Sequence, residues 1–70
     1  MTGGPTERQE QILRVVRTWI AERGEGPTIR EIGLEVGLSS TSSVAYQLRR
    51  MEERGLISRT GHKWRTVHLG

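Results

Sequence analysis

The residues best suited to chemistry in this chain are five consecutive hydroxyl side chains, Ser39 to Ser43, and an arginine pair, Arg49 and Arg50. A hydroxyl group both donates and accepts hydrogen bonds. A guanidinium group donates in a planar fork that matches phosphate oxygens and the edge of guanine. These groups suit the recognition of an acceptor-rich polyanion better than the making and breaking of bonds. The rest of the chain must then position them.

Apolar spacing places these residues on one helix. Val44, Leu48 and Met51 stand at positions i, i+4 and i+7, so they define a buried face. The opposite face is then polar, and it comprises Ser42, Ser43, Tyr46, Gln47, Arg49 and Arg50.

The ends of this helix are also marked. Gly37 interrupts the chain before it, and Leu38 supplies a hydrophobic anchor. Ser39 or Ser40 is expected to cap the first turn, and Gly55 is expected to stop the helix.

Two helices are expected upstream. Thr6, with Gln9 three residues later, forms a capping box that starts a helix over roughly 7–23. Its apolar stripe is predicted to be core, Trp19 included, and comprises Ile12, Leu13, Val16, Trp19 and Ile20. Residues 1–5 are expected to be a disordered lead to one domain over 6–70.

Thr28, with Glu31 at the third helical position, caps a second, short helix that stops near Glu35 or Val36. Gly33 lies inside this helix, where glycine costs about 1 kcal/mol relative to alanine. We therefore expect that another helix approaches closely there.

After Gly55 the pattern changes to that of a β-hairpin with a basic tip. The expected strands are 56–59 and 64–69, joined by a polar turn over 60–63. An isolated hairpin is marginal, so it must pack on the helices through Leu56, Ile57 or Trp64. The fold class expected is α+β: a three-helix winged helix-turn-helix with a C-terminal two-stranded β-hairpin wing.

Composition and charge agree with a small nucleic-acid-binding domain. The chain has 70 residues, 33% of them hydrophobic, and no Cys, so it has one thin core and no disulfide. Residues 1–35 carry five Arg and six Glu, net −1, and residues 36–70 carry five Arg and one Lys against two Glu, net +4. No signal peptide or membrane-spanning segment is evident, and the expected location is cytoplasmic, on the nucleoid.

This order of elements predicts how double-stranded DNA would be bound. One helix fits the major groove, which is about 12 Å wide, and the hairpin reaches the neighbouring backbone or minor groove. The residues expected at phosphates or on the wing are Thr28, Ser39, Thr41, Gln47, Arg49, Arg50, Arg59, His62, Lys63 and Arg65.

Three segments carry a family resemblance over roughly residues 6–69: 6–9, 27–32 and 36–45. They resemble the N-terminal DNA-binding domain of LexA repressors, and the serine run is especially similar to the actinobacterial form. The junction at 54–57 is also similar. The resemblance implies a repressor that occupies an operator, with base contacts carried onto Ser40, Ser42, Ser43, Ala45 and Tyr46. Tyr46 departs from the smaller or imidazole side chain expected there, so operator preference is expected to differ.

The same resemblance implies a second domain, a latent Ser–Lys protease that also dimerises. This chain has one lysine, Lys63, which falls on the expected wing, so we expect no self-cleavage from it. It is either a fragment or a stand-alone protein, with a Met1 start that favours the latter slightly. Because one module binds weakly, we expect two copies, a homodimer on DNA, at an inverted-repeat operator.

Other function classes are less well supported by these residues. A winged helix used for protein contact would favour exposed apolar residues on the third helix, where this chain has Ser, Thr, Gln and Arg. A small antitoxin or phage or plasmid regulator that binds DNA and also a protein partner is a further alternative. His62 and His68 lack further ligands at metal-binding spacing, and Glu52 with Glu53 lacks an acid–base partner. We therefore expect no enzyme activity, metal, cofactor, small-molecule ligand or membrane partner.

Overall fold

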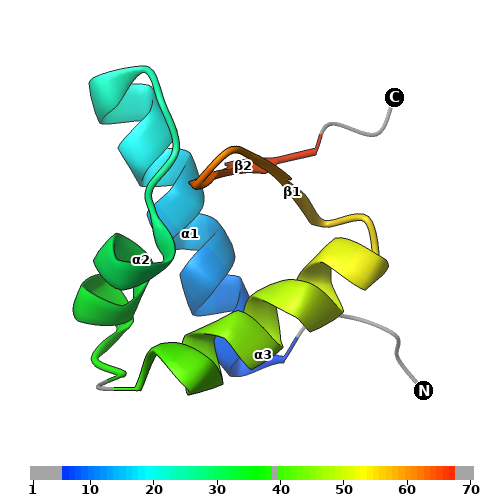
Figure 1. The fold of residues 1–70 in the computed structure, drawn as a ribbon. Helices are drawn as coiled ribbons and strands as arrows, with labels where there is room; N and C mark the ends of the chain where they lie inside the picture. Colours follow the sequence, from blue (N-terminus) through cyan, green and yellow to red (C-terminus); the bar gives the residue numbers. More distant parts are fainter. Residues whose placement is uncertain (1–5, 39, 68–70) are drawn as a thin grey trace.

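The computed structural model describes residues 6–38 and 40–67, in five elements. They are α1 (Glu7–Arg23), α2 (Ile29–Val36), α3 (Thr41–Glu53), β1 (Ile57–Thr60) and β2 (Lys63–Thr66). Helices α1, α2 and α3 are followed by an antiparallel hairpin of β1 and β2 (Figure 1). The α+β winged helix-turn-helix architecture is therefore confirmed. The expected lead over 1–5, Ser39 and the chain end at 68–70 lie outside the described residues.

Local hydrogen bonds set the starts of α1 and α2. The Thr6 hydroxyl accepts from the Gln9 backbone N–H at 3.2 Å, and the Gln9 side chain accepts from the Thr6 N–H at 3.2 Å. Thr28 and Glu31 make the same reciprocal pair, at 3.2 and 2.8 Å. Both capping boxes were predicted, because a cap depends on residues only three apart.

The core lies where all five elements meet. Its fully or nearly fully buried members are Ile12, Val16, Ile32, Val44, Leu48, Met51, Ile57 and Trp64. The predicted buried face of α3 is confirmed, and so is the anchoring of the hairpin through Ile57 and Trp64. Gly33 is buried as expected, and a Cβ there would lie 3.3 Å from the Leu38 carbonyl oxygen.

Trp19 does not join this core, contrary to the prediction. It is half-buried, and the guanidinium of Arg23, one turn later on the same helix, lies 4.2 Å from its ring centroid. Trp19 shares a surface pocket with Val15 and Thr18 of α1 and with Glu35 of α2, whereas its neighbour Ile20 packs on the core. The Trp19 ring therefore lies at the edge of the contact between α1 and α2.

Both strands begin about one residue away from the predicted positions, and β2 ends at Thr66; residues 68 and 69 of the predicted strand lie outside the described residues. Ile57 pairs with Thr66, and Thr60 pairs with Lys63, so the turn itself is Gly61 and His62. Gly61 has φ +64°, which suits the first central position of a type II′ hairpin turn. This tight turn draws Thr60 and Lys63 into the strands.

The loop between α1 and α2 runs along the outer edge of β2. The Trp64 backbone N–H donates to the Pro27 carbonyl oxygen at 2.9 Å, and Pro27 is fully buried. Gly26 lies so close to Trp64 that a Cβ would overlap the Trp64 carbonyl oxygen. The hairpin is thereby attached to the helical part of the domain.

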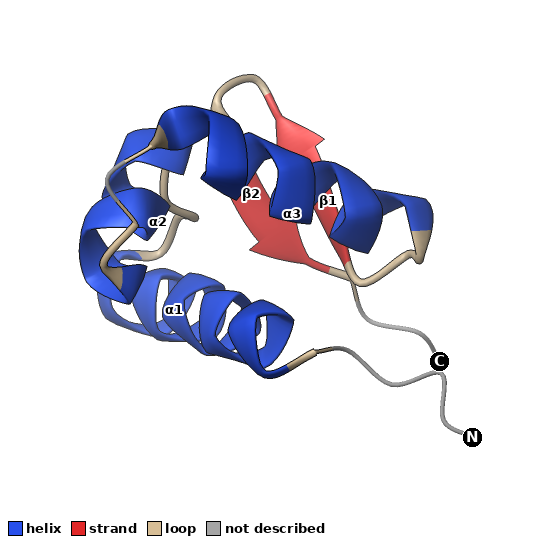
Figure 2. Ribbon diagram, turned by 90° about the horizontal axis from the view of Figure 1, so that it is seen from below, coloured by secondary structure: helices blue, strands red, loops and turns tan. Residues whose placement is uncertain are grey.

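These contacts leave one side of α3 uncovered. Helix α3 packs on α1, α2 and β1. In Figure 2 it runs across the front of the hairpin, and no described element covers its near side. No described helix is long and apolar enough to cross a membrane.

Candidate nucleic-acid interface

The uncovered face of α3 carries the polar residues expected there. Ser42, Ser43, Arg49 and Arg50 are exposed, and Tyr46 retains 59% of its accessible surface. The Arg50 guanidinium carbon lies 5.9 Å from the Tyr46 ring centroid, so the two side chains share one patch. The face therefore presents hydroxyl groups, a phenol and guanidinium groups, all able to hydrogen-bond to DNA.

The start of α3 differs from the starts of the other two helices. Ser40 is the N-cap residue, as one of the two alternatives predicted, but its hydroxyl makes no capping hydrogen bond. The first turn of α3 contains no acidic residue, whereas those of α1 and α2 do. Ser40 and Thr41 are exposed, so their hydroxyl groups are accessible at the positive end of the helix dipole. Ser39 lies outside the described residues.

One flank of α3 forms an open cleft of about 690 Å³ with the hairpin and the start of α2. The cleft brings together five residues predicted from the sequence: Thr28, Ala45, Arg49, Arg59 and His62. Ala45 is half-buried and lines this flank rather than the outermost face of α3.

Arg30 was missed by the sequence analysis and also lines the cleft. Its signal was its position two residues after the Thr28 cap, at the start of α2, the helix that precedes α3. Arg59 joins it across the cleft, with its guanidinium carbon 5.5 Å from the Trp64 ring centroid. The cleft therefore has a cationic lining with one carboxylate, Glu52.

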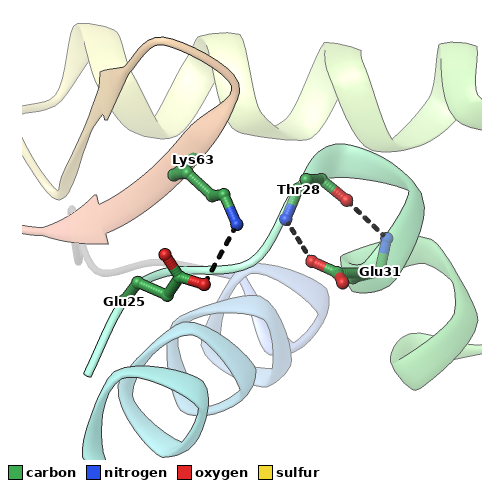
Figure 3. Close-up of polar contacts among 4 residues, drawn as sticks. All are labelled: Glu25, Thr28, Glu31 and Lys63. Carbon is green, nitrogen blue, oxygen red and sulfur yellow. Dashed lines mark hydrogen bonds and ion pairs between the residues drawn. The ribbon is translucent and has the colours of Figure 1, made fainter. Parts of the chain in front are cut away.

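Lys63 and Arg65 do not line this cleft. Because neighbouring residues of a strand point to opposite faces, they lie on the face of the hairpin opposite Trp64. The Lys63 ammonium is 3.3 Å from a carboxylate oxygen of Glu25 in the α1–α2 loop (Figure 3). The four wing residues predicted as one group therefore divide into two pairs, Arg59 with His62 and Lys63 with Arg65.

The other flank of α3 meets the start of α1. Gln47 was predicted to point outward, but it is half-buried, and its Oε1 accepts a hydrogen bond from Gln9 Nε2 at 3.1 Å. Arg8 reaches across to α2, where it donates to the Val36 carbonyl oxygen at 2.9 Å. Side chains of α1 thus hold both helices of the helix-turn-helix.

The capping box of α2 perturbs one carboxyl group. The Thr28 backbone N–H donates to the Glu31 carboxylate, and this bond holds the pKa of Glu31 below its usual range (Figure 3). No group of three metal-ligating side chains occurs within 6–38 and 40–67.

Known proteins match this chain over nearly its whole length. The family model described as LexA DNA binding domain matches residues 3–66. The chain is 54% identical over 68 residues to the LexA repressor of Mycobacteroides abscessus, covering 97% of this chain and 30% of that protein. It is 55% identical over 64 residues to the LexA repressor of Mycobacterium ulcerans, covering 91% of this chain and 26% of the relative. It is 49% identical over 69 residues to that of Mycobacterium leprae, covering 99% and 29%. The chain thus spans at most 30% of the length of these relatives.

Proposed function

The chain belongs to the LexA DNA-binding domain family, and on that premise we propose that it binds double-stranded DNA sequence-specifically, as part of a transcriptional repressor acting on the nucleoid. Helix α3 enters the major groove, and the hairpin contacts the neighbouring backbone. Ser40, Ser42, Ser43 and Tyr46 contact base edges, with Ala45 at the wing side of the groove.

The observation that carries this proposal is the fixed orientation of α3. Its apolar side is locked into the core by Val44, Leu48 and Met51, each with no exposed surface. Its free side therefore presents Ser42, Ser43, Tyr46 and two arginines in one fixed orientation relative to the core. Tyr46 is the one large apolar side chain exposed on this helix. A helix that docked on a protein would need several such side chains.

Basic residues on the free face of α3 and in the cleft beside it complete the proposed interface. Arg49, Arg59 and His62 line the cleft on one side, and Arg50 lies on the exposed face. Each phosphate neutralised by Lys or Arg releases counterions, so affinity falls as salt rises. A single module of this size buries roughly 600–1,000 Å² on DNA. Two copies on an inverted repeat gain from effective concentration, and we propose this arrangement for the operator.

Selection from a pool of random duplexes tests this function. The purified chain is incubated with the pool, and bound DNA is amplified and sequenced over several rounds. We expect a consensus that contains an inverted repeat with half-sites about one helical turn apart. A pool that stays random after selection contradicts sequence-specific binding, and a single unrepeated site contradicts the paired arrangement.

A further inference from the structure

Gln9 is the one buried polar residue within 6–38 and 40–67, with 5% of its surface exposed. It lies at the third position of α1, where its side chain takes part in the capping box with Thr6. A cap of this kind is usually exposed, so burial of the amide needs a second reason. A buried amide must also have its hydrogen bonds satisfied, because an unpaired group is costly.

The capping box determines which way the Gln9 amide points. The Thr6 backbone N–H is a donor and lies 3.2 Å from Gln9 Oε1. The amide nitrogen is therefore on the other side, where Nε2 donates to Gln47 Oε1 at 3.1 Å. Turning the Gln9 amide over would set donor against donor at Thr6.

The orientation of Gln47 follows from that of Gln9. Its acceptor is used by Gln9, so its two N–H groups point away from that contact. They have no acceptor within the described residues. At about 100° per residue, Gln47 lies on the flank of α3 facing α1, and Ala45 and Glu52 lie on the flank facing the wing.

A helix in the major groove has a phosphate backbone on each side. The cleft with Arg59 and His62 lies on one side of α3, and Gln47 lies on the other. Phosphate oxygens only accept hydrogen bonds, so they suit an amide that presents its nitrogen and not one that presents its oxygen.

We propose that Gln9 is a positioning residue for DNA binding: it orients the amide of Gln47 so that Nε2 donates to a backbone phosphate on the side of the groove away from the wing. The inference rests on the proposed function. It adds a donor-to-acceptor direction to these contacts. The Thr6 N–H donates to Gln9, the Gln9 amide donates to Gln47, and the Gln47 amide donates to the DNA phosphate. Loss of the capping bond and loss of the DNA contact are thereby separable.

Gln9→Glu separates them. A glutamate at this position keeps an oxygen for the Thr6 N–H, and it is a preferred residue of the capping box, so the fold is retained. Its second oxygen cannot donate, so the Gln47 amide must turn over and present its oxygen to the phosphate. Gln11→Glu is the matched control, because it adds the same charge two residues away on the exposed side of α1.

Affinity for the selected duplex is measured by fluorescence anisotropy, with unfolding followed by circular dichroism. We expect Gln9→Glu to weaken binding about tenfold while still unfolding cooperatively above the assay temperature, with Tm lowered by burial of the carboxylate, and Gln11→Glu to weaken binding less than threefold. In a Gln47→Ala background the Gln9→Glu effect should shrink below threefold, because its route to DNA is gone. An equal loss from both glutamates, or an undiminished loss in the Gln47→Ala background, overturns the proposal.

Side-chain amide exchange in the free wild-type domain gives a test that needs no variant. NMR should show slow exchange for the Gln9 NH2 group, and fast exchange for that of Gln47 until duplex is added. The reverse order, or no protection of Gln47 in the complex, contradicts this donor-to-acceptor direction. If the wild-type chain binds no duplex at all, the proposed function fails, and the amide exchange of the free protein still decides the orientation.

Discussion

Replacing Gly26 with alanine tests the attachment of the wing to the helices. The new Cβ would overlap the Trp64 carbonyl oxygen, and backbone atoms on both sides leave nothing flexible to yield. The α1–α2 loop must therefore move off the edge of β2. That movement breaks the 2.9 Å bond from the Trp64 N–H to the Pro27 carbonyl oxygen, worth about 1 kcal/mol. It also uncovers part of Pro27 and Trp64, both of which are buried.

The lost hydrogen bond and the uncovered apolar surface together set the expected loss in the free energy of unfolding. Full exposure of a large apolar side chain costs about 1.5–3 kcal/mol. With the lost hydrogen bond, we expect Gly26→Ala to lower the free energy of unfolding by about 2–4 kcal/mol. At roughly 4–8 °C per kcal/mol for a domain of this size, Tm should fall by at least ~8 °C.

Gly24→Ala is the matched control two residues earlier. Gly24 has φ +77°, and a Cβ added there would meet no neighbouring atom within 4 Å. Its cost is therefore backbone strain alone, about 1–2 kcal/mol. Urea unfolding followed by circular dichroism measures both variants. If Gly26→Ala costs no more than Gly24→Ala, the loop does not pack on β2 as described.

Three further predictions concern the wing, the free face of α3 and the capping box of α2. Arg59→Ala should weaken binding to specific and random duplexes alike and reduce the slope of log affinity against log salt by about 0.9. An unchanged slope rules out a phosphate contact. Arg14→Ala, on the outer side of α1, is the control. Tyr46→Ala should change the preferred base at one position of the selected site, by about 1–3 kcal/mol, and an unaltered consensus refutes its role. Because the pKa of Glu31 is lowered in the folded state, its carboxylate stabilises the fold above the usual Glu pKa of about 4.3, and that contribution is lost as pH falls through and below this value. Glu31→Gln keeps the cap, so its stability should fall less between pH 6 and pH 3 than that of the unmodified chain, and equal losses in urea titrations count against the argument.

Features that depend on near neighbours in the sequence were predictable. The capping boxes at Thr6 and Thr28 each join residues three apart, and they placed the starts of α1 and α2 correctly. The buried face of α3 followed from helical spacing, because Val44 and Leu48 are one turn apart. The family resemblance was likewise confirmed over residues 3–66.

Features that depend on distant pairs were not predictable. Gln9 and Gln47 are 38 residues apart, and the sequence indicated a capping box for Gln9 and an outward-facing position for Gln47, but nothing in it indicated that the two side chains meet. The division of the four wing residues into two pairs depends on the register of the hairpin, because a one-residue shift moves every side chain to the opposite face. Trp19 fits the apolar stripe of α1, but the stripe does not reveal which of its members lie at the edge of the contact with α2.

An NMR titration of the labelled domain with the duplex selected from the random pool tests whether the free face of α3 meets the bases. Backbone and side-chain signals of the labelled domain are followed as duplex is added. We expect the largest shifts, and protein–DNA contacts to base protons, at Ser42, Ser43 and Tyr46, with smaller changes at Arg59 and His62. Contacts to the duplex from the outer side of α1 around Trp19, with the α3 signals unmoved, would contradict this expectation.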